Sequence, residues 1–250
     1  MSGHSKWANI KHKKGAADAK RGRIFSKIAK EIMIACGHGG GDINSNPTLR
    51  TLIQKARAVN MPADNVDRAI KRGTGQLQGE RIEEILFEGF APGGVALIVQ
   101  ALSDNRNRTV AEVRHVFTKH GGNLAGQGQV MRSFTRRGQI LVSAAAVEED
   151  QLMELVLEAG AEDMTRDGDQ YEVLTDPAQF VNVVEALHKA DIPTISSEVT
   201  LIPANYVPVA GKEKAAALLR FVDELDELDY VQNVYSNFDI DASLLEELNK

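Results

Sequence analysis

The chain has 250 residues, of which 43% are hydrophobic and 26% charged, enough for two or three domains of ordinary size. Its one cysteine, Cys36, excludes an internal disulfide. Neither an 18-residue apolar run nor the apolar stretch of a secretory leader occurs, so a membrane span or export is not indicated and we expect a cytoplasmic protein. The formal net charge of −6 conceals a division along the chain. Residues 1–72 carry 15 Lys or Arg against 5 Asp or Glu, whereas residues 73–250 carry 14 against 30, which predicts a polyanion as partner of the first part.

The densest positive charge lies between Lys6 and Lys30. Residues 3–22 contain few periodic apolar residues, so we expect an arm without a core of its own that is mobile until it binds. Docking on the acidic part of the same molecule, or on an acidic protein, is the alternative to binding a nucleic acid. The candidate nucleic-acid contacts here are Lys6, Trp7, Lys11, His12, Lys13, Lys14, Lys20, Arg21, Arg23 and Lys27.

Three helices are predicted next, and they form a small basic domain over residues 1–79. Apolar residues recur at helical spacing from Ile24 to Ala35, and glycines end this helix. A second helix begins at Asn46 with Pro47 in its first turn, and a third follows Pro62.

After Gly79 the pattern becomes extended. It predicts strands over 82–90 and 95–102, a helix over 109–120 that starts with a capping box at Thr109 and Glu112, and a strand over 129–134. A helix over 213–225 and a strand over 231–235 complete this α/β domain, residues 80–136 plus 205–250.

The intervening residues 137–204 have the order β-α-β-β-α-β, which is ferredoxin-like. The predicted strands are 140–143, one near Met164, 171–174 and 199–202, and the helices are 149–159 and 176–189. The expected fold class is therefore α+β: a basic helical domain followed by two α/β domains, the ferredoxin-like one inserted into the other.

No catalytic, cofactor or metal signature is found. The glycines around Gly39 and Gly75 follow helices and fit neither a P-loop nor a dinucleotide fingerprint. One cysteine near His38 does not make a zinc site, and His115 and His120 are about 140° apart on a helix. We therefore expect a protein that is not an enzyme and holds neither cofactor nor metal.

Arg106 and Arg108 lie in a polar turn before the helix predicted at residue 109. A helix N-terminus attracts anions, and two guanidinium groups there would clamp a phosphate. In the alternative, Asp104 and its neighbours only build the turn, and the arginines pair with acidic side chains. The same ambiguity applies to a smaller basic group, Arg132, Arg136 and Arg137.

The chain resembles the YebC/PmpR family over nearly its whole length. The resemblance lies in residues 1–15 (MSGHSKWANIKHKKG), 68–73 (RAIKRG), 88–94 (EGFAPGG), 103–115 (SDNRNRTVAEVRH) and 121–124 (GGNL). It departs over 129–134, where Arg132 replaces an expected apolar residue. The resemblance implies a three-domain fold and a role in gene expression, because members are labelled probable DNA-binding transcriptional regulators while mitochondrial relatives resemble translational activators.

Three hypotheses follow from these observations. The first is a non-enzymatic DNA-binding regulator of transcription that holds phosphates with little reading of bases. The second is a ribosome-associated translation factor that binds ribosomal RNA through the same arm, with its acidic α/β domains facing a protein partner or tRNA. The third is a scaffold whose basic domain docks on its acidic one.

Overall fold

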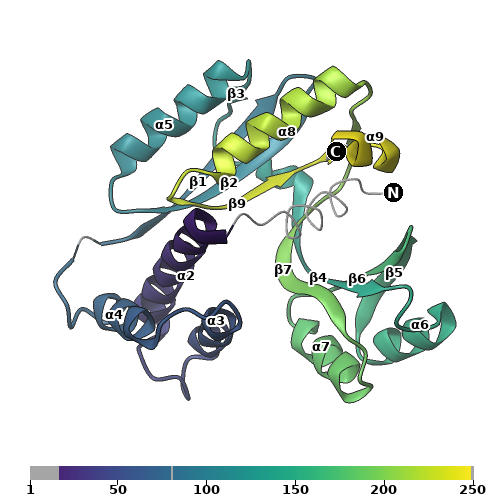
Figure 1. Ribbon diagram of the computed structural model, residues 1–250, viewed down its shortest axis with the longest axis horizontal. Helices are drawn as coiled ribbons and strands as arrows, with labels where there is room; N and C mark the ends of the chain where they lie inside the picture. The colour runs from purple at the N-terminus through teal and green to yellow at the C-terminus, as the bar shows by residue number, and fades with distance from the viewer. Residues whose placement is uncertain (1–16, 80, 249–250) are drawn as a thin grey trace. The chain divides into compact units, whose positions relative to one another are not determined.

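The computed structural model describes residues 17–79 and 81–248 (Figure 1). These residues fall into two compact units. One comprises residues 131–206, and the other contains the described residues before 131 and after 206. Helices and antiparallel sheets are mixed in the chain, with a helical region first, so the predicted α+β class is confirmed.

The helical region is built from three helices around a small core. The second helix begins as predicted: Asn46 Oδ1 accepts a hydrogen bond from Leu49 N at 3.0 Å, and Pro47 occupies the first turn. The helices are α2 (Ala17–Gly39), α3 (Pro47–Ala58) and α4 (Ala63–Gly73). Their buried side chains are Ile28, Ile32, Cys36, Leu49, Ile53, Ala56, Met61 and Ala69.

Helix α2 starts earlier than expected, so residues 17–22 are not part of an irregular arm. The prediction placed them in the arm because they contribute no apolar face. A helix interior tolerates such residues once the following turns are held by packing, as those of α2 are through Ile28 and Ile32.

A close approach of two helices fixes the geometry of this domain. A Cβ at Gly73, the last residue of α4, would lie 2.6 Å from the Met33 carbonyl oxygen and 2.7 Å from Cys36 Cβ. No larger residue fits there without moving the backbone of α2. Gly73 therefore sets the distance between α2 and α4.

The first sheet has strand order β3-β1-β2-β9, with all neighbours antiparallel. Helices α5 and α8 lie together on one face of it, where the Phe117 and Phe221 rings meet edge to face at 5.0 Å (Figure 1). The elements are β1 (Glu83–Ala91), β2 (Val95–Ser103), α5 (Arg106–Lys119), β3 (Asn123–Leu124), α8 (Lys212–Asp226) and β9 (Val231–Ser236). A parallel pair, β8 (Val207–Pro208) and β10 (Phe238–Asp239), and the terminal helix α9 (Ala242–Leu248) complete this region.

Residues 131–206 form a ferredoxin-like unit with sheet order β5-β6-β4-β7. Its neighbouring strands are antiparallel, and its core joins Ile140 and Val173 of the sheet to Leu152 and Leu187 of the helices. The elements are η1 (Met131–Ser133), β4 (Phe134–Ser143), α6 (Glu149–Glu158), β5 (Ala161–Asp167), β6 (Gln170–Thr175), α7 (Phe180–Lys189) and β7 (Thr194–Pro203).

The strand predicted over 129–134 is wrong. Residues up to 130 form a turn, η1 follows, and β4 begins only at Phe134. The reason is a buried carboxylate: Glu88 accepts hydrogen bonds from the backbone N–H groups of Gly128 and Val130, both at 2.6 Å. These donors are therefore satisfied without a neighbouring strand.

The predicted helix starts at Thr109 and Asp176 are also wrong. Helix α5 begins at Arg106 with Asn105 as its cap, and Thr109 is buried one turn inside, 2.7 Å from Ser103 Oγ. Asp176 accepts from Ala178 N in a turn, and α7 starts at Phe180. In both places a short polar side chain forms a local hydrogen bond, and composition alone does not say which of two such residues caps the helix.

Candidate nucleic-acid interface

Most of the predicted contacts in the arm lie outside the described residues: Lys6, Trp7, Lys11, His12, Lys13 and Lys14. Lys20 and Arg21 belong to the first turns of α2, and Arg21 is exposed. A role for these residues in nucleic-acid binding stays a prediction.

Further along α2, the cations meet the acidic end of α8. Arg23 Nη1 lies 3.7 Å from Glu227 Oε1, and Lys27 Nζ lies 3.2 Å from Asp226 Oδ1 and 3.3 Å from its carbonyl oxygen. A helix C-terminus carries partial negative charge, so Lys27 is attracted by both the side chain and the helix dipole. A phosphate would have to compete with these carboxylates for Arg23 and Lys27.

Lys30 extends the same contact one turn on. Its Nζ donates to the Asp229 carbonyl oxygen at 3.0 Å. Burial lowers the pKa of Lys30, and the nearby carboxylates of Asp104 and Asp229 oppose that shift only in part. Burial therefore disfavours the charged form of the Lys30 ammonium group at this position.

A polar cavity of about 460 Å³ opens beside Lys30. Lys30 and Arg108 line it together with four carboxylates, and the Tyr230 hydroxyl donates to Glu112 Oε2 at 2.8 Å. Burial and this hydrogen bond raise the pKa of Tyr230, so it stays protonated. With more acids than bases on its wall, the cavity is a poor site for a phosphate. The carboxylates are those of Asp104, Glu112, Glu227 and Asp229.

The two arginines predicted as a phosphate clamp occupy the first turn of α5 and differ in their surroundings. Arg108 Nη2 lies 3.2 Å from Asp104 Oδ1, the pairing expected if the arginines are structural. Arg106 is exposed and makes no ion pair with another described residue. At this helix N-terminus Arg106 alone, and not Arg106 together with Arg108, is therefore available to an anion.

Helix α4 carries basic residues that the sequence reasoning did not select. Arg68, Lys71 and Arg72 are exposed and form no ion pair within the described part of the chain. Their spacing of three and four residues puts them within about 100° on one side of the helix. That spacing, in the segment RAIKRG, was visible in the sequence.

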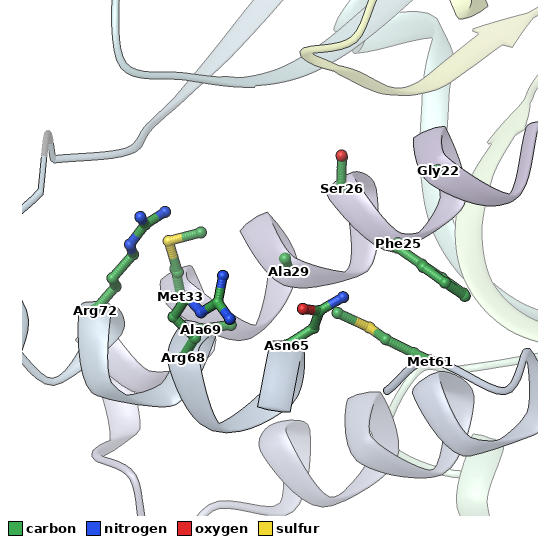
Figure 2. Close-up of a pocket in the computed structure, with 10 residues that line it drawn as sticks. All are labelled: Gly22, Phe25, Ser26, Ala29, Met33, Met61, Asn65, Arg68, Ala69 and Arg72. Atoms are coloured by element: carbon green, nitrogen blue, oxygen red, sulfur yellow. The ribbon is translucent and has the colours of Figure 1, made fainter. Parts of the chain in front are cut away.

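An apolar groove of about 320 Å³ runs between α2 and α4 (Figure 2). Figure 2 shows one wall formed by α2 from Gly22 to Met33 and the other by α4 from Asn65 to Arg72. The groove is lined by Gly22, Phe25, Ser26, Ala29, Met33, Met61, Asn65, Arg68, Ala69 and Arg72. None of these side chains is acidic.

The smaller basic group predicted from the sequence, Arg132, Arg136 and Arg137, lies in the ferredoxin-like unit. Arg137 pairs with Glu162, whereas Arg132 and Arg136 are exposed. Arg132 occupies η1, so the apolar strand position expected from the family pattern does not exist there.

The described residues contain no group of three or more His, Cys, Asp or Glu side chains able to hold a metal ion. Cys36 is buried in the helical core, and burial raises the pKa of its thiol, which makes it a poor nucleophile. In the same part of the chain, no helix is long and apolar enough to cross a membrane.

The fold and this surface define a class: an α+β protein with a basic helical domain followed by α/β sheets. The chain belongs to the TACO1/YebC family. Residues 5–76 match the model of the TACO1/YebC protein N-terminal domain, and residues 82–238 match that of the TACO1/YebC second and third domain.

Similar proteins cover the whole chain. A probable transcriptional regulatory protein of Geobacter sulfurreducens is 53% identical over 99% of this chain and 100% of its own length. One of Solibacter usitatus is 52% identical over the full length of both. The crystal structure of a conserved hypothetical protein from Aquifex aeolicus is 46% identical, with a TM-score of 0.83 over 94% of this chain and 97% of that one.

Proposed function

We propose that this protein is a non-enzymatic, cytoplasmic regulator of transcription that binds duplex DNA through its basic helical domain. The observation that carries the proposal is the exposed triad of α4, Arg68, Lys71 and Arg72, none of which pairs with a described acid. The names of the relatives from Geobacter and Solibacter point the same way.

The α4 triad provides electrostatic contact to phosphates and does not select a base sequence. Arg and Lys side chains on an exposed helix bind phosphates, which positions a protein on DNA without selecting bases. The lysines of residues 6–14 add charge from the segment that precedes α2. We therefore expect affinity that depends strongly on salt and weakly on sequence.

The test is a competition between two polyanions. Fluorescent protein is mixed with duplex DNA and intact ribosomes at equal phosphate concentration. The fractions of protein bound to each are measured from about 50 to 200 mM salt. Two variants accompany it: R68Q/K71Q/R72Q, and a chain lacking residues 1–16, which leaves α2 intact.

The expected result is preference for DNA. The salt slope, which is the slope of the logarithm of the binding constant against the logarithm of salt concentration, should become smaller by about 2 to 3 in the α4 variant and by about 3 to 4 in the truncated one. Preference for ribosomes would replace the regulator by a translation factor that uses the same charges. Binding to neither polyanion would contradict both the regulator and the translation-factor hypotheses and would favour a scaffold whose basic domain docks on its acidic one.

A further inference from the structure

The groove between α2 and α4 has the properties of a docking site for a helix. Its α2 wall runs from Gly22 to Met33, which is about 16 Å of helix or three turns. The small side chains along both walls, Ser26, Ala29 and Ala69 among them, allow another backbone to come close. An amphipathic helix of about three turns matches these dimensions.

The groove is apolar inside and positive at its edge. Phe25, Met33 and Met61 supply a ring and two thioethers, soft surfaces that adapt to different apolar side chains. Arg68 and Arg72 lie on the α4 side (Figure 2). Neither forms an ion pair with another described residue. An occupant thus needs apolar residues on one face and carboxylates beside them.

We infer that this groove binds an acidic amphipathic helix of a partner protein. The partner's apolar face fills the space over Met33 and Met61, and its carboxylates pair with Arg68 and Arg72. This inference does not depend on DNA binding, although the two arginines would serve both ligands and a bound helix would compete with DNA for them.

Two segments of the chain itself do not fit the groove as occupants. Residues 6–14 are rich in lysine, so the arginines of the groove would repel them. Helix α9 has the required acidic and apolar composition, but Leu245 is fully buried in the core of the α/β region. Duplex DNA presents charged phosphates and offers no apolar side chain to fill the interior of the groove.

The test uses a fluorescein-labelled helical peptide of about four turns, with leucines at spacing i, i+4 and i+7 and glutamates on both sides of them. A scrambled peptide of the same composition controls for charge alone. The protein variants are S26W, which fills the groove from an exposed position of α2, and Q54W, its matched control on the exposed side of α3.

We expect fluorescence anisotropy to show micromolar binding of the amphipathic peptide only, weakened at least ~10-fold by S26W and less than ~2-fold by Q54W. R68E/R72E should reject the acidic peptide and accept the same peptide with lysines in place of glutamates. Circular dichroism of S26W and Q54W verifies that both variants are folded.

Three results would overturn the inference: no binding of the amphipathic peptide, equal binding of the scrambled peptide, or no effect of S26W on peptide binding. The outcome is separable from that of the proposed function, because S26W leaves every basic residue in place. A protein that binds DNA normally with S26W but never binds the peptide would refute only the docking site.

Discussion

Helices α2 and α4 are both basic and belong to one small domain, yet their cations have different surroundings. Arg23, Lys27 and Lys30 of α2 contact acidic or carbonyl oxygens at the end of α8, whereas the cations of α4 pair with no described residue. Charge density along a sequence therefore does not measure the charge available to a partner. In this domain, availability depends on which helix faces the acidic α/β region.

The largest expected effect comes from forcing the two helices apart. Gly73→Ala places a Cβ 2.6 Å from the Met33 carbonyl oxygen, and we expect a loss of about 1–3 kcal/mol in the free energy of unfolding. Urea titration of the helical domain measures it. Gly22→Ala is the control: its Cβ meets nothing within 4 Å, so it should be neutral or stabilise by up to about 1 kcal/mol. Equal stability of the two variants would show that Gly73 does not set the helix spacing.

The next effect separates the two sets of cations in DNA binding. R68Q/K71Q/R72Q should weaken binding to duplex DNA ~10-fold or more and lower the salt slope by about 2 to 3. R23Q/K27Q should change the affinity less than ~3-fold, because these side chains already contact Glu227 and Asp226. Larger losses in the α2 variant would reverse the ranking.

Releasing the α2 cations should produce a smaller change of opposite sign. Asp226→Asn with Glu227→Gln removes the carboxylates beside Lys27 and Arg23, so both become available to phosphates. We expect DNA affinity to rise ~2- to 5-fold and the salt slope to steepen by up to about 2. An affinity that does not change would mean that DNA does not reach this face of α2.

The smallest expected effect is a pH dependence from Lys30. Its pKa in the folded protein lies below the value of 10.5 for the free side chain, mainly because of burial. Between these two values the unfolded chain binds the proton that the native state has lost, so the contribution of Lys30 to stability rises with pH up to about 10.5. Cys36 and Tyr230, whose pKa values are raised, contribute in the opposite direction in the wild type and in Lys30→Met alike. The difference in urea midpoint between the wild type and Lys30→Met should therefore shift in favour of the wild type as pH rises toward about 10.5, and a constant difference would assign no pH dependence to Lys30.

Local patterns in the sequence predict the elements well where apolar periodicity is strong. The helix that follows Asn46 and the buried strand β2 lie where expected. One error occurs where a hydrogen bond from a distant residue decides, as with Glu88 and the backbone of Val130. Two others occur where neighbouring polar residues compete to cap a helix, at the starts of α5 and α7. The site was harder to predict, because contacts such as Lys27 with Asp226, 199 residues apart, are invisible in a charge count.

The pairing of β2 with β9 has a consequence for synthesis. Strand β2 is buried along nearly its whole length, and its second neighbour in the sheet is Val231–Ser236. Residues 104–230, which include the whole ferredoxin-like unit, must therefore leave the ribosome before this hydrophobic edge is covered. A nascent chain that pauses in this interval exposes an open strand, the kind of surface that chaperones recognise and that aggregates in their absence.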